Sequence, residues 1–395
     1  MPAPSPAPVH SDAAFDGLLK QAHAIGKEAL APHAADVDRD ARFPREALAA
    51  LRGAKFLSAA VPAAYGGAGL DIVQVGKLCE ALGHYCASSA MIYAMHMIQV
   101  ACIARHAGQS AYFQDYLRTL VEEQRLIASA TTELGVGGDL RSSICAAEVS
   151  GNAFRLTKQA PVISYGEDAD EILVTCRSGP AAQASDQVQI LVRREDCRLE
   201  RLSAWDTLGF RGTCSSGFTL TATGKTAQII PAPFAGILAE TMHPYSHAVW
   251  CSLWGGIAAD AVNVGRAFVR AEARKTPGET PISAVRLAEV NSLLQEMQHN
   301  VAAFTREYAA LLAGDDPEAF GGFGFAIRTN NLKVSCSQRV VEIVGRALLI
   351  CGIAGYRNDS KFSLTRHLRD AYGAALMVNN DRITKLNATL LLAHK

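Results

Sequence analysis

The chain has 395 residues, and its 38 Lys and Arg against 38 Asp and Glu give a formal net charge of zero. Such a balance excludes the strongly basic proteins that attract nucleic-acid phosphates. Hydrophobic residues make up 49% and charged residues 19% of the sequence, which excludes intrinsic disorder and a disulfide scaffold. The length is sufficient for two or three domains with a large core.

The cysteine spacing and the apolar stretches indicate in which compartment the protein resides. Ten cysteines are present without a CxxC pair, so the spacing gives no metal site, and most lie in apolar runs typical of buried, reduced thiols. Residues 1–12 alternate Pro and Ala, which favours a flexible tail over a signal peptide. The most apolar stretch of the first third, 88–104, is interrupted by His96 and Gln99 and is too short for a membrane span. We therefore expect a cytoplasmic protein in a reducing compartment.

The first third of the chain, 13–125, is predicted to be a helical domain. Apolar residues recur there at the three- and four-residue spacing of one helical face. Those of the first such face are Phe15, Leu18, Leu19, Ala22 and Ile25. The glycine-rich run 65–69 interrupts the pattern and predicts a flexible loop between two helices.

Short β-branched segments bounded by Gly, Asp, Asn or Ser follow, and they predict a small antiparallel β domain over 126–233. Examples are 154–157, 171–176, 188–192 and 217–223. The helical spacing returns after Pro233, which predicts a helical domain over 234–395. Few large folds place one β domain between two helical domains.

Several motifs occur in an order that is typical of one enzyme family. They are Leu57–Leu70 (LSAAVPAAYGGAGL), Thr131–Asp139 (TTELGVGGD), Trp205–Thr213 (WDTLGFRGT), Gly352–Tyr356 and Arg366–Asp370. Each motif is weak alone, but in this order the chain resembles the acyl-CoA dehydrogenase family of flavoproteins over nearly its whole length. The resemblance implies an α+β fold with an N-terminal helical domain, a central antiparallel β domain and a C-terminal four-helix bundle. It also implies a homodimer or homotetramer.

The glycine-rich segment after Thr131 and Thr132 is suited to the close approach of a cofactor. Gly135, Gly137 and Gly138 have no Cβ, so their backbone N–H groups are open to a diphosphate or an isoalloxazine edge. An ordinary connecting loop is the alternative interpretation. The resemblance implies bound FAD, and the residues that it places in the cofactor site are Ser129, Thr131, Thr132, Gly137, Gly138, Ser164, Arg274 and Asn380.

Three positions depart from the family pattern around the cofactor. Val162 replaces the aromatic residue that shields the flavin, and Gly138 replaces the serine of a G-S-D motif. Ser164 keeps a hydroxyl at the place of the family's W-[IV]-[ST] motif, although a surface serine at a strand end is the alternative. Arg274 is followed by Pro277 instead of the family's R-x-x-F-G pattern. A phosphate contact across subunits and a solvated helix end therefore both remain open for Arg274.

The largest departure concerns the catalytic base. The reaction that the resemblance implies needs a desolvated carboxylate that removes the α-proton of an acyl thioester while a hydride leaves the β-carbon. The usual Glu falls on Val378, or on Met377 with a one-residue slip, and no Glu follows Glu342. The remaining candidates are Asp381, Glu240 and His247. Asp381 is the first choice for the base. The alternative interpretations are that Asp381 is a helix N-cap, that Glu240 faces solvent and that His247 is a core residue.

The sequence thus predicts an enzyme: a divergent acyl-CoA dehydrogenase-like flavoprotein that dehydrogenates an acyl thioester on CoA or on a carrier protein. Its electron acceptor would be an electron-transfer flavoprotein or oxygen. One alternative is a flavin-dependent oxygenase or oxidase on the same fold, which would need no α-proton base. A second alternative is a catalytically silent subunit of a mixed complex, or a protein that keeps the fold as an interaction platform.

Overall fold

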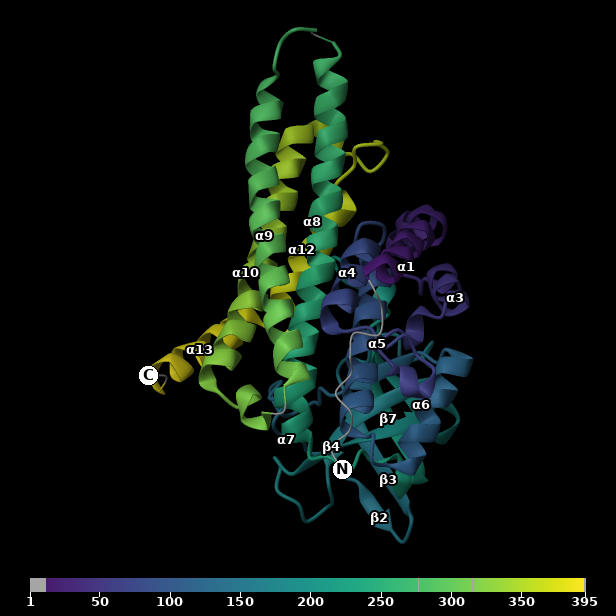
Figure 1. The fold of residues 1–395 in the computed structure, drawn as a ribbon. Coiled ribbons are helices and arrows are strands. Elements are labelled where there is room, and N and C mark those ends of the chain that lie inside the picture. The colour runs from purple at the N-terminus through teal and green to yellow at the C-terminus, as the bar shows by residue number, and fades with distance from the viewer. Residues whose placement is uncertain (1–11, 276, 315, 394–395) are drawn as a thin grey trace.

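The computed structural model describes residues 12–275, 277–314 and 316–393 (Figure 1). Of the predicted flexible tail, residues 1–11 lie outside this part of the chain, and Asp12 begins the first helix. Helices form the N-terminal part, strands the middle and helices the C-terminal part, which confirms the predicted fold class.

The N-terminal helices pack around one almost completely buried helix. Their bounds are α1 (Asp12–Ile25), α2 (Ala34–Arg39), α3 (Arg45–Gly53), α4 (Ile72–Gly83), α5 (Ala87–His106) and α6 (Ala111–Glu123). A capping box starts α4, because the side chain of Asp71 accepts from the backbone of Gln74 and the Gln74 side chain accepts in return. Among the described residues, α5 alone has the length and apolar composition to cross a membrane, and 89% of its apolar window is buried inside the protein.

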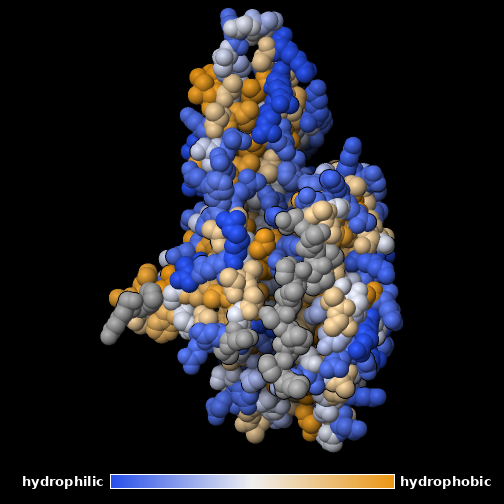
Figure 2. Space-filling view, viewed as in Figure 1, coloured by the Kyte–Doolittle hydropathy of each residue, from blue (hydrophilic) through white to orange (hydrophobic). Residues whose placement is uncertain are grey.

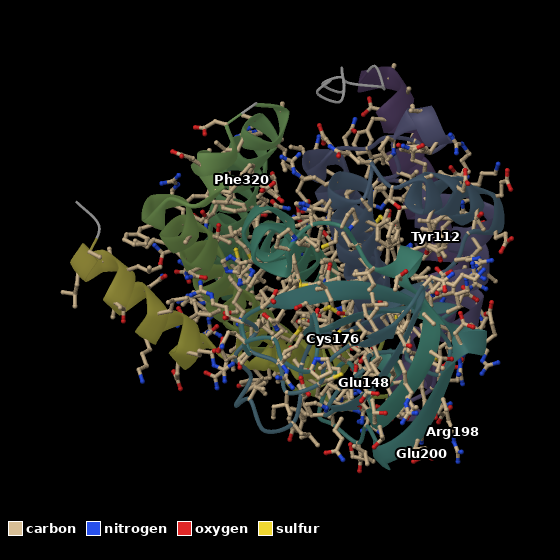
Figure 3. All side chains as sticks on the ribbon, turned by 90° about the horizontal axis from the view of Figure 1, so that it is seen from below. Tyr112, Glu148, Cys176, Arg198, Glu200 and Phe320 are labelled. Carbon is tan, nitrogen blue, oxygen red and sulfur yellow. The ribbon has the colours of Figure 1, made fainter. Side chains whose placement is uncertain are left out.

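The strands form two sheets in the described part of the chain. Their bounds are β1 (Ile127–Ala130), β2 (Glu148–Ser150), β3 (Ala153–Ala160), β4 (Glu171–Arg177), β5 (Gln187–Arg193), β6 (Cys197–Ser203) and β7 (Gly217–Lys225). One sheet has the order β1-β4-β5 and the other β2-β3-β7-β6. All pairs are antiparallel except β1 with β4, because the chain passes through the second sheet between these two strands. Cys176 of β4 lies in the interior, whereas Arg198 and Glu200 lie on the outer edge at β6 (Figure 3).

The C-terminal helices form a long bundle. Their bounds are α7 (Phe234–Ile237), α8 (His243–Ala273), α9 (Ile282–Ala313), α10 (Phe323–Cys351), α11 (Ile353–Tyr356), α12 (Thr365–Leu376) and α13 (Asn380–Ala393). Figure 1 shows α8, α9 and α10 extending well beyond the rest of the protein, and Figure 2 shows apolar side chains gathered on this extension. Large exposed apolar side chains of the bundle include Ile282, Leu349, Ile353 and Leu376.

The Arg366–Asp370 motif joins all three parts of the fold. Arg369 of α12 forms an ion pair with Asp38 of α2, and Arg211 donates from Nε to the Asp38 carbonyl at 2.8 Å. The carboxylate of Asp370 accepts from the backbone N–H of Phe210 at 2.7 Å. Burial raises the pKa of Asp370 to about 6. This motif is therefore a structural connection between the helical parts and the β part.

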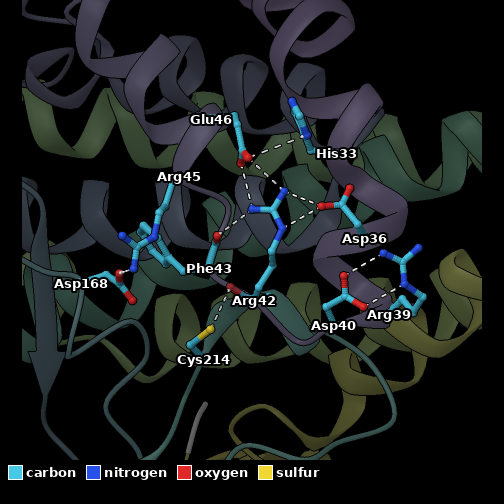
Figure 4. A network of polar contacts seen from close by, with 11 residues as sticks. His33, Asp36, Arg39, Asp40, Arg42, Phe43, Arg45, Glu46, Asp168 and Cys214 are labelled. Atoms are coloured by element: carbon cyan, nitrogen blue, oxygen red, sulfur yellow. Dashed lines mark hydrogen bonds and ion pairs between the residues drawn. The ribbon is translucent and has the colours of Figure 1, made fainter.

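A second polar network fixes α2 against α3 (Figure 4). The guanidinium of Arg42 donates to Asp36 at 2.7 Å and to Glu46 at 2.9 Å, so one cation pairs with a carboxylate on each helix. Arg45 reaches Asp168 in the β part at 3.2 Å. These pairs are partly exposed, so they contribute orientation more than free energy of unfolding.

His96 of α5 gives the first testable prediction. Its ring is fully buried, Nε2 donates to the Leu57 carbonyl at 2.7 Å, and Nδ1 accepts from the Ile127 N–H at 3.0 Å. Burial lowers the pKa of His96 to about 4. The unfolded chain, with an ordinary pKa of about 6.5, binds the extra proton between these values, so stability falls as pH falls through that window.

We expect His96 alone to contribute about 3 kcal/mol of stability at pH 7 that is lost by pH 4. Urea unfolding at pH 7, 6 and 5 measures the slope for the wild type and for His96→Gln. The variant should be less stable at pH 7 and should show a shallower decline towards acid. Equal slopes in the two proteins would contradict the assignment.

Candidate functional site

The glycine-rich loop after β1 meets the first turn of α13. The guanidinium of Arg382 donates to the carbonyls of Gly137 and Gly138, which lie far from it in the sequence. The structure therefore brings the predicted cofactor loop and the C-terminal segment that carries Asn380 and Asp381 to one place. This junction between the β part and the bundle is the candidate functional site.

The two threonines of the loop are half-buried and stand at the edge of the β1-β4-β5 sheet. The hydroxyl of Thr131 lies 3.0 Å from that of Ser129 and 3.4 Å from that of Thr175 on β4. Thr132 donates to the Val162 carbonyl at 3.4 Å, so the loop is also bonded to the segment that follows β3. Three predicted site residues, Ser129, Thr131 and Thr132, thus lie together.

Ser164 follows Val162 by two residues and makes its own set of polar contacts. It is 6% exposed and accepts from the hydroxyl of Ser215 at 2.8 Å, and Ser215 in turn lies 2.8 Å from the hydroxyl of Thr213. The alternative of a surface serine is wrong, because the segment after β3 folds inward onto the WDTLGFRGT motif. Its neighbour Tyr165 holds a positive φ of 43°, an unusual conformation for an aromatic residue that fixes the direction of the turn.

A buried ion pair, which the sequence analysis did not predict, supports the loop. Lys158 of β3 is fully buried, and its ammonium donates to the Thr175 carbonyl at 2.6 Å and to the Thr131 carbonyl at 3.3 Å. It pairs with Glu133 at 3.4 Å, and that carboxylate also accepts from the Cys145 N–H at 2.6 Å. The alternation of β3 was the available signal, since Lys158 occupies the same buried face as its apolar neighbours.

The place of the usual catalytic Glu has an unusual backbone. Val378 has a positive φ of 44°, which is strained for a β-branched residue. Its carbonyl accepts from the ammonium of Lys333 at 3.2 Å, and the side chain of Asn380 accepts from the same ammonium at 2.7 Å. Lys333 is fully buried on α10, and burial lowers its pKa to about 8. Asn380 thus holds the segment against the bundle through Lys333.

Arg274 is separated from the other predicted site residues. It is exposed and directly follows the last residue of α8. Because α8 has 31 residues, about 45 Å separate Arg274 from His243 at the start of the helix. Figure 1 shows this end of α8 at the far tip of the bundle. One chain does not bring Arg274 to the loop, and a contact with a cofactor would need a second copy.

The three candidate bases occupy different surroundings. Asp381 is exposed in the first turn of α13, and the N-cap contact is made by Asn379, whose side chain accepts from the Asp381 N–H at 2.8 Å. The alternative that Asp381 itself caps the helix is therefore wrong. Glu240 is partly buried and lies 3.6 Å from Arg105, so it does not simply face solvent. His247 is buried, and its Nε2 has no partner among the described residues.

Hydrogen bonding and burial define the state of His247. Its Nδ1 donates to the His243 carbonyl at 2.8 Å, which leaves Nε2 unprotonated. Burial lowers the pKa of His247 well below its ordinary value. The ring is therefore neutral and a weak acceptor of protons.

Comparisons with known proteins agree with the motif order. A family model described as the acyl-CoA dehydrogenase N-terminal domain matches residues 15–124. Cyclohex-1-ene-1-carbonyl-CoA dehydrogenase of Geobacter metallireducens is 25% identical over 368 residues, covering 92% of this chain and 93% of the relative.

Two solved structures share the fold. FMN-bound TdsC of Paenibacillus sp. A11-2, a dibenzothiophene monooxygenase, has a TM-score of 0.84 at 18% identity and covers 95% of this chain and 97% of its own. Butyryl-CoA dehydrogenase of Megasphaera elsdenii has a TM-score of 0.79 at 19% identity, and the match covers 97% of this chain and 99% of the dehydrogenase. The fold, the ordered motifs and the similarity along the sequence together support membership of the acyl-CoA dehydrogenase family.

Proposed function

We propose that this chain is an FAD-dependent enzyme that dehydrogenates an acyl thioester, carried on CoA or on a carrier protein, between its α- and β-carbons. The observation that carries the proposal is the loop–α13 junction, where Thr131, Thr132 and Ser164 meet a glycine-rich turn and the segment of the expected base. The end-to-end similarity to a named acyl-CoA dehydrogenase supports the same chemistry.

The residues at the junction fit a flavin. Three glycines of the loop, Gly135, Gly137 and Gly138, have positive φ values of 92°, 59° and 77°, and their N–H groups have no acceptor among the described residues, as in backbone anion sites. The half-buried hydroxyls of Thr131 and Thr132 offer donors and acceptors beside them. When bound, the flavin would supply the acceptor for the β-hydride. The chain's own task is to bind the thioester, exclude water and hold the group that takes the α-proton.

Cofactor binding is tested on the purified protein. We expect a yellow protein, or a colourless one whose melting temperature rises on addition of FAD, because a ligand that binds only the folded state stabilises it. Calorimetry with FAD, FMN and riboflavin identifies the preferred form. A colourless protein that shows neither a spectral change nor a thermal shift with any of them would contradict the proposal.

Asp381 is the proposed base, with Glu240 and His247 as the other candidates. Its position supports it, since the neighbouring Arg382 contacts the cofactor loop directly. In the chain by itself the carboxylate is exposed. To act as the base it would therefore need bound flavin and substrate to exclude water from it.

The oligomer and the acceptor belong to the same proposal. The exposed apolar residues of the bundle and the remoteness of Arg274 support a homodimer or homotetramer in which helix faces pack across a two-fold axis. An electron-transfer flavoprotein or oxygen would reoxidise the flavin. We also propose the division into domains at 13–125, 126–233 and 234–395, and a cytoplasmic location.

A flavin-dependent oxygenase is the second candidate, and the observation that favours it is Val378 at the place of the usual carboxylate. TdsC shows that the fold also occurs in a monooxygenase. Anaerobic mixing with thioesters separates the two reactions. Bleaching of the flavin supports dehydrogenation, whereas oxygen consumption with reduced flavin and no bleaching by any thioester supports the oxygenase. Turnover only with a Glu-bearing partner subunit would identify a silent subunit.

A further inference from the structure

We infer that Arg382 binds the phosphate of the flavin nucleotide, together with the N–H groups of the Gly135–Gly138 turn. This inference rests on the proposed flavin cofactor and goes beyond it, because it assigns the phosphate contact to the same chain as the loop. Arg382 was not among the residues that the sequence predicted for the site.

Arg382 is a cation without a counter-ion. Its two terminal nitrogens donate to the carbonyls of Gly138 and Gly137, and its side chain is exposed. No carboxylate of the described chain lies within ion-pair distance of it, whereas exposed arginines such as Arg118 and Arg198 have such a partner. A guanidinium has five N–H donors, so three remain for a ligand.

The loop adds backbone donors beside this cation. The N–H groups of Gly135, Gly137 and Gly138 donate to no acceptor in the described residues, and all three glycines have positive φ. Successive N–H groups in such a turn form a concave anion site. The carbonyls of Gly137 and Gly138 face Arg382, so the N–H of Gly138, which lies opposite the Gly137 carbonyl in its peptide plane, points away from the guanidinium. The N–H groups of Gly135 and Gly137 are the unpaired donors that remain for an anion bound to Arg382.

Gly138 and Arg382 depend on one another. A Cβ at Gly138 would lie 2.8 Å from Nη2 of Arg382 and 3.0 Å from its Cζ, so a side chain there would displace the guanidinium. The family's G-S-D motif carries a serine at this place, and this chain has glycine. The glycine makes room for the arginine, which supplies a charge where the motif supplies a hydroxyl.

The two partners come from opposite parts of the fold. Gly137 and Gly138 follow β1, whereas Arg382 belongs to α13. A phosphate bound to the free donors of Arg382 and to the turn would be held by the β part and by the bundle at once. Riboflavin, which has no phosphate, would lack this contact and would bind through its ring system alone.

The test is calorimetric or fluorescence titration of the full-length apoprotein with FAD, FMN and riboflavin. Because hydrogen bonds to a charged group are stronger than neutral ones, Arg382→Met should weaken FAD and FMN binding about 10- to 100-fold. Riboflavin binding should stay within about two-fold, since its contacts are unchanged. Lys385→Met, an exposed position on the next turn of α13, is the matched control and should change none of the three affinities.

A double-mutant cycle provides a second readout. Gly138→Ala should weaken FMN binding in the wild type and should cost less when Arg382 is already Met, because the displaced group is gone. Additive effects would contradict the coupling. If Arg382→Met weakens FMN and riboflavin binding equally, Arg382 only stabilises the loop, and the inference is overturned. It is also overturned if the variant binds all three flavins normally and loses affinity only for CoA thioesters. If the wild-type protein binds no flavin of any kind, the proposed function itself fails.

Discussion

Replacing Asp381 by Asn is expected to slow the reduction of bound flavin by an acyl thioester roughly 10²- to 10⁴-fold, the usual cost of removing a general base. Asparagine keeps the size and the hydrogen-bonding shape of the side chain but cannot accept the α-proton. Flavin affinity should change little, because the contacts between α13 and the loop are made by Arg382. Stopped-flow absorbance under anaerobic conditions measures the rate.

Asp115→Asn is the matched control, since Asp115 is an exposed aspartate on α6. A wild-type rate in Asp381→Asn would exclude this residue and would direct the same test to Glu240→Gln and His247→Gln. Val378→Glu is the complementary variant, and it should raise the rate only if the pocket admits an acyl chain beside that position.

Replacing Lys158 by Met is expected to lower the free energy of unfolding by about 3–5 kcal/mol and to weaken flavin binding. The variant leaves the carboxylate of Glu133 buried without its cation, which is far more costly than the loss of an exposed pair. It also removes the donor that fixes the Thr131 and Thr175 carbonyls at the start of the cofactor loop. Urea unfolding and flavin titration measure the two effects.

The double variant Lys158→Met, Glu133→Gln tests the reason for this loss. If the unpaired charge is the cause, neutralising Glu133 should recover a substantial part of the stability. Lys275→Met, which removes an exposed pair with Glu272, should cost less than about 1 kcal/mol. Equal losses in the single and double variants would show that packing of the lysine stem, and not charge, is what Lys158 contributes.

The order of elements could be predicted from the sequence because it depends on local patterns. Helical spacing around Phe15 and the alternation of β3 each reflect one buried face, and a short window of sequence contains that signal. The parallel pair β1 and β4 was not predicted, since β1 has four residues and its partner lies beyond a second sheet. Pairing between distant strands leaves no mark in either strand alone.

The sequence could predict the residues of the loop and the segment with Asn380 and Asp381, but not the contact between these two segments. The glycines and threonines of the loop form a contiguous motif, whereas Arg382 contacts this loop across 244 residues of sequence. Lys158 and Lys333 are charged residues in otherwise apolar patterns, and their burial depends on partners that other elements supply. A buried lysine is tolerated where carbonyls or a carboxylate accept hydrogen bonds from its ammonium.

Anaerobic mixing of the FAD-loaded protein with a panel of acyl thioesters tests the proposed function most directly. We predict that at least one thioester bleaches the flavin absorbance and yields the α,β-unsaturated thioester in equal amount. The same thioester deuterated at its α- and β-carbons should bleach the flavin more slowly, because both bonds break in the reaction. If no saturated thioester bleaches the flavin, while the protein consumes oxygen with reduced flavin, the account of this chain as a dehydrogenase is contradicted.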